Sequence, residues 1–516
     1  MVRVLLFMPL CASIGMGQIA GPARAPDKSP TEKSMTALLD RVSSLPVEYK
    51  ADLTFAIIDA NPSSLSSARK RALLDDVFHS AASAHYAYYM MDTAHHHQGT
   101  APSVSHLMGN ALFTLHSDTL EIQTRAIERA LPLAPQFAAH LFEELNLGEV
   151  RASCKDPAVV DLSAFYTTAA KIIEDKRIKT VFKQDKAIYL QNLASSMRVP
   201  AQISPLANLI THASLSSEQL GQVEMAFVSS LSTITASDRE MSAAEKWDHS
   251  LTNTIESLSA KLTQSGISSE PLIVVYRGFL VRSLTPERCA DNSLDRAEMA
   301  KSFSTLLPSK APETSDMSPL SGTQLNPKST GDTASDEIVP FNEQLAPQLT
   351  RIASAHQARI AEGYRLGQPP TVEPEDSDIE DVVKYISSLE PGDAECSVCD
   401  FGSKNSLLMH TIELLPAGHQ LERLINAEVD YMSFNAMQKD NPTAWLFYFK
   451  LFVNISRKTT DKDTVALTAQ AKNGQQPWWL PSPEASVIRN SLRKSSDPII
   501  ATYMSTEDLL HPPYEN

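Results

Sequence analysis

The sequence lacks the short motifs that mark common enzymes and nucleotide-binding proteins. It has no G-x-S-x-G elbow, no H-E-x-x-H helix, no phosphate-binding glycine loop and no dinucleotide fingerprint. Glu143 and Glu144 are adjacent, and adjacent helical residues point in different directions, so they do not form a catalytic carboxylate pair. We therefore assign no catalytic residue and no cofactor. An enzyme of this sequence needs a site assembled from residues far apart in the chain.

Glycine and positive charge are also scarce. Only 17 of the 516 residues are glycine, whereas Ala, Leu, Ser, Glu and Lys recur, which favours helix over sheet. The net charge of −16 argues against binding of nucleic acid, because neutralising phosphates needs a basic surface. A hydrophobic content of 42% is typical of a globular protein, and the length predicts two or three domains.

Long apolar runs are missing after the N-terminus. The chain begins with Arg3, an apolar stretch over 4–14 and then small residues, a pattern typical of an export signal. We expect residues 1–20 to be a signal peptide and the mature protein to be periplasmic or extracellular. The alternative, an uncleaved anchor, is disfavoured because the stretch is shorter than the ~20 residues that span a bilayer. The apolar segments 272–281 and 444–453 each contain a basic residue, so we expect no transmembrane helix in the mature chain.

The stretch 117–147 shows the pattern that recurs through the chain, which is a pair of amphipathic helices. Asp118 can cap the first helix, and Glu121 stands where a capping-box acid belongs. Pro132 and Pro135 break the apolar stripe and restart it. Such a pair cannot bury its apolar faces alone and must stack on neighbours. The sequence therefore predicts an all-α protein, an irregular solenoid-like stack of antiparallel helix pairs.

The same periodicity divides the chain into regions. Residues 31–307 read as nearly continuous helix and form a predicted N-terminal helical domain. Residues 308–338 contain four prolines, many Ser and Thr and no aromatic residue, so we expect a disordered linker. Residues 339–516 form a predicted smaller C-terminal helical domain. The helices expected in the first region include a long one that ends in the aromatic tail 85–91 and a continuous one over 237–264.

Four cysteines follow the expected signal peptide, namely Cys154, Cys289, Cys396 and Cys399. In an exported protein an even number of cysteines indicates disulfides, and four cysteines allow three connectivities. A bridge between Cys154 and Cys289 closes a loop long enough to contribute about 5 kcal/mol in the chain-entropy model. The sequence leaves the pairing open.

The C-x-x-C motif at 396–399 has several readings. A thioredoxin-like redox site needs a preceding strand, and here a Pro-Gly-Asp turn precedes the motif. A zinc site needs two further ligands, and His410 and His419 are loosely placed. Asp400 excludes covalent haem, because that motif requires histidine at this position. A structural disulfide or buried thiols are the favoured reading.

Histidines are frequent between His79 and His116, and three of them are consecutive at 95–97. Neutral imidazole is a common metal ligand. No two of these histidines within the expected helices stand four residues apart, and the triple has only Asp92 as a carboxylate nearby. We interpret the triple as a solvated loop and assign no metal ligand.

Three segments resemble uncharacterised exported helical proteins found in certain bacteria. They are QTRAIERALPLAPQFAAHLFEEL at 123–145, a cysteine followed by AFYTTA (Cys154 and 164–169), and YRGFLVRSLTPERCADN at 276–292. The resemblance implies export and a helical fold, and it assigns no activity. The stacked helix pairs, which can form a concave surface, and the missing catalytic motifs lead to the hypothesis of a scaffold or protein-interaction module of the cell envelope. The alternatives are a secreted enzyme, or a thiol-redox or metal-binding protein that uses the C-x-x-C motif.

Overall fold

A computed structural model describes most of the chain. The described residues are 30–60, 65–92, 104–148, 151–154, 158–178, 186–246, 251–284, 289, 296–307, 320, 345–366, 375–387, 397–415, 419–435, 442–457 and 484–510. Residues 1–29, which contain the predicted signal peptide, lie outside this part of the chain. Apart from Leu320, which is buried, so does the predicted linker 308–338.

The protein is all-α apart from one small sheet, as the sequence predicts. The elements before residue 200 are α1 (Pro30–Ser43), α2 (Val47–Asp59), α3 (Ser67–Ser80), η1 (Ala81–Ser83), β1 (Met90–Asp92), α4 (Val104–Leu115), α5 (Thr119–Leu133), α6 (Pro135–Glu143), β2 (Ala158–Val160), α7 (Ser163–Glu174) and α8 (Lys186–Ser195). Those up to residue 305 are η2 (Pro200–Gln202), α9 (Ile203–His212), α10 (Ser217–Leu231), α11 (Asp238–Lys246), α12 (Leu251–Gln264), α13 (Glu270–Leu284) and α14 (Arg296–Thr305). The C-terminal elements are α15 (Ala346–Leu366), α16 (Asp376–Ser387), α17 (Ser397–Leu414), α18 (His419–Asn435), α19 (Pro442–Arg457), α21 (Glu484–Lys494) and α22 (Pro498–Leu510).

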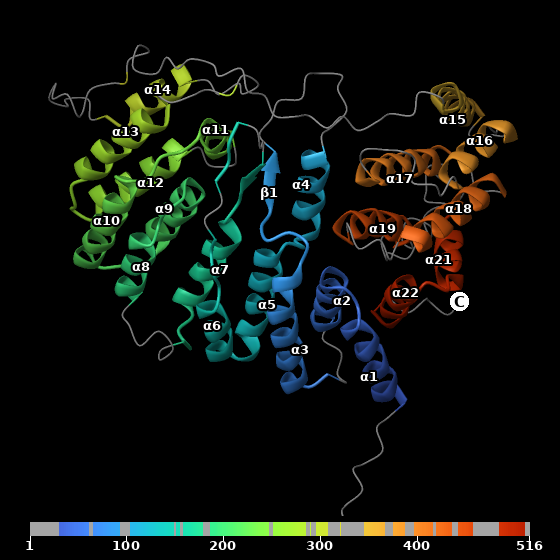
Figure 1. Cartoon of the computed structure of the whole chain (residues 1–516), viewed down its shortest axis with the longest axis horizontal. Helices are drawn as coiled ribbons and strands as arrows, with labels where there is room; N and C mark the ends of the chain where they lie inside the picture. Colours follow the sequence, from blue (N-terminus) through green and yellow to red (C-terminus); the bar gives the residue numbers. More distant parts are fainter. Residues whose placement is uncertain are drawn as a thin grey trace, which may run out of the picture.

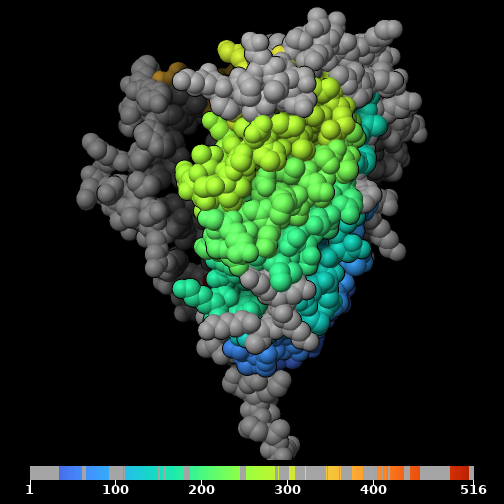
Figure 2. Space-filling view, turned by 90° about the vertical axis from the view of Figure 1, so that its left-hand side faces the viewer, coloured from blue at the N-terminus to red at the C-terminus, as the bar shows by residue number. Residues whose placement is uncertain are grey.

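The helices before residue 305 form a row (Figure 1). α3 packs on α5, α5 on α7, α7 on α9 and α9 on α12, while α10 packs on both α8 and α13. Figure 2 looks onto the end of the row, where α8, α10 and α13 form one continuous surface. The predicted helix over 237–264 is described as two helices, α11 and α12, on either side of residues 247–250.

The helix pair α5 and α6 follows the sequence prediction closely. The Asp118 side chain caps α5 by accepting a hydrogen bond from Glu121 N at 3.0 Å. The Glu121 carboxylate binds Nδ1 of His116, so the predicted capping box has only its first half. Pro135 begins α6, whereas α5 continues through Pro132 for one more residue. A proline near the end of a helix removes one hydrogen bond without ending the helix.

The buried cap of α5 predicts a dependence of stability on pH. Asp118 is fully buried and its Oδ2 has no hydrogen-bond partner. Burial, and secondly the charge of Glu121, raise the pKa of Asp118 from 3.8 to about 8, although backbone N–H groups oppose the shift. A carboxyl with a higher pKa in the folded chain holds its proton more tightly there. Its stabilising contribution is therefore complete below pH 3.8 and is lost as the pH rises towards 8.

Asp118→Asn keeps the cap and removes the ionisation. Between pH 6 and pH 9 we expect the wild-type protein to lose about 2.5 kcal/mol of unfolding free energy relative to Asp118→Asn. Urea unfolding of both proteins across this range measures the difference, and titrations shared by the two proteins cancel in it. Equal pH profiles would show that Asp118 ionises normally in the folded protein. Asp118→Ala serves as the control that loses the cap, at a cost of about 1 kcal/mol.

The sequence did not predict the two-stranded sheet. β1 and β2 are antiparallel, with Met90 opposite Val160 and Asp92 opposite Ala158. α3 ends at Ser80, so the aromatic tail 85–91 that was expected to continue this helix runs instead through bends and irregular backbone into β1. Asp161 N donates to Tyr89 O at 3.1 Å and extends the pairing beyond the strands. Strands of three residues are too short to show an alternating pattern in the sequence.

The C-terminal helices pack on the first helices of the row (Figure 1). α22 contacts α1 and α2, and α19 contacts α2 and α4. Lys450 forms an ion pair with Asp52, and the Tyr503 hydroxyl donates to Asp52 Oδ2 at 3.2 Å. One buried apolar cluster includes residues of both regions, from Met35 to Met504. The division into two domains remains a prediction, and this packing joins the two predicted domains along a shared core.

Candidate functional site: a groove between α7 and α9

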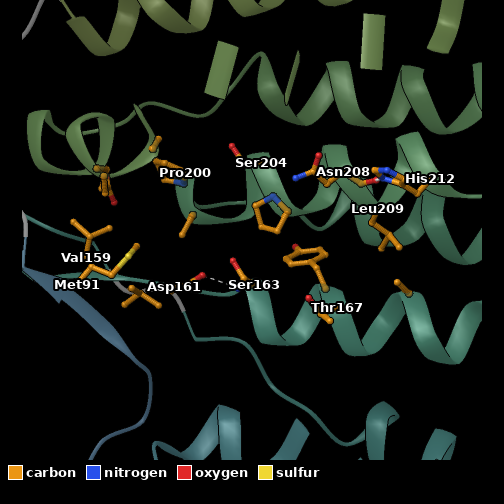
Figure 3. Close-up of a pocket in the computed structure, with 18 of the residues that line it drawn as sticks. Met91, Val159, Asp161, Ser163, Thr167, Pro200, Ser204, Asn208, Leu209 and His212 are labelled. Atoms are coloured by element: carbon orange, nitrogen blue, oxygen red, sulfur yellow. Dashed lines mark hydrogen bonds between the residues drawn. The ribbon is translucent and has the colours of Figure 1, made fainter. Parts of the chain in front are cut away.

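The described part of the chain contains a cavity of about 590 Å³ between α7 and α9 (Figure 3). The sheet and α11 close one of its ends. The residues that line the cavity come from six neighbouring parts of the fold, namely the sheet, α4, α7, η2, α9 and α11, with the residues next to them. They are Met91, Phe113, Val159, Val160, Asp161, Ser163, Tyr166, Thr167, Ala170, Glu174, Pro200, Ala201, Ser204, Pro205, Asn208, Leu209, His212, Ala213, Glu240, Ala243 and Ala244. A volume of this size suits a small molecule or a few residues of a peptide.

Local interactions fix the start of each wall. Asp161 Oδ1 accepts a hydrogen bond from Ser163 N at 2.8 Å, which satisfies a free N–H at the start of α7. On the other side, Gln202 Oε1 accepts from Arg198 N at 2.6 Å and from Val199 N at 3.0 Å. These bonds fold the chain into η2, and α9 begins directly after it. Both helices therefore start at the same end of the groove, beside the sheet.

Polar side chains follow each wall at helical spacing. Ser204, Asn208 and His212 stand four residues apart on α9 and line the groove. Ser163 and Thr167 have the same spacing on α7, and Figure 3 shows them across from the α9 series. Residues four apart lie on one face of a helix, about 6 Å from each other along the axis. The groove therefore has a regular row of hydrogen-bonding groups on each side.

Two hydroxyl groups in the lining have no hydrogen-bond partner, namely Tyr166 OH and Ser204 Oγ. Tyr166 is only 2% exposed. Burial raises its pKa, and the nearby Gln202 side chain opposes the shift without reaching hydrogen-bond geometry. Leaving a buried hydroxyl unpaired costs about 1–3 kcal/mol. Both oxygens are closed to solvent, so a ligand in the groove pairs with them only if neighbouring side chains move.

The charges that line the groove are all negative. Asp161 and Glu240 lie at the sheet end, and Glu174 lies on α7. Glu174 Oε1 accepts from Lys186 Nζ at 2.7 Å, outside the lining. Burial raises the pKa of Glu240, and Arg151 Nη1 lies 3.7 Å from its Oε2. Among the described residues no lysine or arginine lines the cavity. The groove therefore favours a neutral or positively charged ligand.

His212 is not arranged as a catalytic base. Its Nδ1 lies 2.8 Å from the carbonyl oxygen of Asn208 in its own helix. Within the described part of the chain, the hydrogen bonds of His212 include none with a serine or cysteine side chain. A nucleophile of this kind requires a base within about 3 Å. The groove presents binding groups, and it does not present a nucleophile paired with its base.

A disulfide fixes the α11 wall of the groove. Cys154 and Cys289 are bonded, with their Cα atoms 5.2 Å apart, which is one of the pairings that the sequence left open. Cys289 N donates to Asp238 Oδ2 at 3.0 Å, and Arg239 Nη2 donates to Cys154 O at 3.0 Å. These two α11 residues directly precede Glu240, which lines the groove. The cross-link therefore positions α11 through the backbone of both cysteines.

The other predicted features lie partly outside the described residues. Cys396 is not described, and Cys399 lies in α17 with its side chain outside the described part of the chain. The histidines at 95–97 also lie outside it. His79 Nε2 lies 3.1 Å from Glu144 Oε2. Within the described ranges, no group of three or more His, Cys, Asp or Glu side chains is placed to hold a metal ion.

Comparison with protein-family models, with curated proteins and with solved structures finds no match to this chain. The function must therefore be argued from the groove itself. Among the described helices none is long and apolar enough to cross a membrane. The sequence reasoning gave no role to any residue of the groove. The signal that could have found it is the four-residue spacing of Ser204, Asn208 and His212 beside apolar neighbours.

Proposed function

We propose that the protein is an exported helical scaffold and interaction module of the cell envelope, and that it binds an extended segment of a partner protein between α7 and α9. The observation that carries the proposal is the spacing of the polar groups along the groove. Three residues of α9, Ser204, Asn208 and His212, span about 12 Å at 1.5 Å per residue. Four residues of an extended chain span about 13 Å.

Because these two lengths agree, each successive polar side chain of α9 can reach every second peptide unit of an extended chain. An extended chain exposes its N–H and C=O groups at a repeat of two residues, about 6.6 Å. The Asn208 amide both donates and accepts, as does the exposed hydroxyl of Thr167. The apolar lining between them, including Leu209 and Ala170, can cover the side chains of the peptide. Binding of the backbone then gives affinity, and the apolar lining gives selectivity.

Export is part of the proposal, and the disulfide supports it. Disulfides persist in the periplasm and outside the cell and are rare in reducing compartments. The bond between Cys154 and Cys289 joins segments that are 135 residues apart and holds α11 against the groove. A binding site whose wall depends on a disulfide is suited to an oxidising compartment.

The test is a peptide selection against the full chain with its disulfide intact. Random twelve-residue peptides are displayed on phage, selected and then titrated against purified variants by calorimetry. We expect Asn208→Ala to weaken binding by about 1–3 kcal/mol, or 5- to 150-fold, because it leaves peptide groups unpaired. Thr167 is exposed at the groove, so Thr167→Trp should fill the groove and abolish binding without unfolding the protein.

A matched control removes an amide elsewhere. Gln222 is exposed on α10 and does not line the groove, so Gln222→Ala should bind selected peptides like the wild-type protein. Peptides that bind the wild-type, Asn208→Ala and Thr167→Trp proteins equally would place the binding site elsewhere. A selection that yields no binding peptide would contradict the proposal itself.

A further inference from the structure

We infer that the sheet end of the groove is a subsite for an arginine side chain of the bound segment. This inference rests on the proposed function, because it names the chemistry of the partner at one position. It starts from Phe113, which lines the groove from α4 and is 58% exposed. An aromatic ring exposed to this degree at the edge of a cavity offers a free face to a ligand.

Phe113 and Asp161 each contact the same residue, Tyr89. The Phe113 ring is tilted against the Tyr89 ring with 5.6 Å between centroids. Asp161 N donates to Tyr89 O at 3.1 Å. Burial raises the pKa of Tyr89 to about 12, and the charges of Asp161 and Glu121 contribute. The Asp161 charge therefore acts on Tyr89, the ring that Phe113 contacts, and Figure 3 shows Asp161 beside Met91 and Val159 at the end of the groove.

An exposed aromatic face beside a carboxylate matches the guanidinium group. Arginine stacks its planar group on an aromatic ring and directs a fork of N–H donors to a carboxylate. A carboxylate offers about four acceptor positions, so the bond from Ser163 N to Asp161 Oδ1 leaves room for further donors. Met91 and Val159 can cover the three methylene groups of the arginine stem. A lysine ammonium has the charge but lacks the plane and the fork.

The other charged groups around this end do not cancel the preference for a cation. Glu240 adds a second carboxylate to the lining. Arg151 is near Glu240, but it donates to the carbonyl oxygens of Thr235 at 2.8 Å and Arg198 at 3.1 Å. On the α4 side, His116 lies 6.2 Å from the Phe113 ring, measured between ring centroids, and is paired with the Glu121 carboxylate.

The probe is a single capped residue, so the test does not depend on finding a peptide partner. Ligand-observed NMR measures the Kd of Nα-acetyl-arginine methylamide and of its citrulline analogue, which has nearly the same shape and no charge. We expect arginine to bind the wild-type protein at least tenfold more tightly than citrulline. Asp161→Asn should reduce arginine binding to the citrulline level. This substitution keeps the acceptor for Ser163 N, so the start of α7 is preserved.

The contribution of the ring is tested with Phe113→Leu, which keeps apolar volume and removes the aromatic face. We expect it to weaken arginine more than lysine, tested as its acetylated methylamide. Phe434→Leu on α18, another exposed phenylalanine, and Glu218→Gln on α10 serve as controls and should leave the Kd unchanged. Equal binding of arginine and citrulline would overturn the inference, as would arginine binding that survives Asp161→Asn and Phe113→Leu.

The outcomes separate the two proposals. If selected peptides bind the groove but show no preference for arginine over citrulline, the proposed function stands and the subsite is wrong. If capped arginine binds through Asp161 and no peptide is selected, the subsite stands as a site for small cations and the extended-segment function is wrong.

Discussion

Replacing Cys154 by serine is expected to lower the free energy of unfolding by about 5 kcal/mol. The disulfide to Cys289 closes a loop with a sequence separation of 135. In the chain-entropy model, a cross-link stabilises the protein by restricting the unfolded chain, and the effect grows with the logarithm of the loop length. An effect of this size is comparable to the whole stability of many domains, about 5–15 kcal/mol.

Urea unfolding measures this loss and tests its cause. Cys154→Ser, Cys289→Ser and the double variant all lack the same cross-link, so the three should have nearly the same midpoint. The wild-type protein in reductant should have the same midpoint as the variants, and the oxidised wild-type protein should unfold at a higher urea concentration. Coincident curves for the oxidised protein and the variants would show that the two cysteines are not bonded in solution. A double variant much weaker than either single variant would indicate lost packing around the buried Cys289 instead.

Loss of the cross-link is also expected to alter the position of α11 at the groove. Asp238 and Arg239 hold the backbone of the two cysteines, and Glu240, Ala243 and Ala244 of the same helix line the cavity. α11 has only nine residues, and isolated helices of this length are marginal in water. Its position therefore depends on what it is fastened to, and the disulfide is one of these attachments.

The sequence was informative wherever structure depends on neighbouring residues. Asp118 caps α5, Pro135 begins α6, and the apolar segment over 272–281 lies within α13. The basic residue Arg282 in α13 also has hydrogen-bond partners, because its guanidinium group donates to the carbonyl oxygens of Leu231 and Ile234. Caps, proline positions and helical stripes act over one or two turns, and these are the distances that a sequence pattern records.

The candidate site could not be read in the same way, because distant segments form it. Asp161 lies between β2 and α7, Asn208 lies on α9, and Phe113 comes from α4. Nothing in any one of these segments differs from an ordinary surface helix. The burial of the Ser204 and Tyr166 hydroxyls without partners is also visible only in the structure. Burial and pairing are properties of the packed chain, so they lie beyond local pattern reasoning.

The packing of the C-terminal helices on the N-terminal ones was also missed. The composition of residues 308–338 predicts a linker between two separate domains. In the structure, Lys450 pairs with Asp52, 398 residues away in sequence. The ring centroid of Tyr49 in α2 lies 5.3 Å from that of Trp445 in α19 and 6.4 Å from that of Tyr503 in α22. A linker pattern reports the properties of the connection, and it says nothing about whether the parts it joins touch.

This shared core predicts a large effect for Trp445→Ala, a loss of about 3–5 kcal/mol. Trp445 is 2% exposed, and its Nε1 donates to Met432 O at 2.9 Å. Its ring stacks on Phe449 at 4.7 Å between centroids and meets the Tyr49 ring edge-on. The substitution therefore leaves a cavity at the junction of both regions, and it also leaves the Met432 carbonyl without this donor.

Calorimetry and urea unfolding show whether the substitution destabilises both regions together or the C-terminal region alone. If the two regions fold as one unit, Trp445→Ala shifts a single transition, because the cavity lies in a cluster that both regions share. If they fold independently, the substitution shifts a C-terminal transition and leaves a second, N-terminal one near its wild-type midpoint. Phe434→Ala is the matched control. That ring is 55% exposed on α18, so its removal should change stability by no more than about 0.5 kcal/mol. A Trp445→Ala protein as stable as the Phe434→Ala control would mean that this junction does not form in solution.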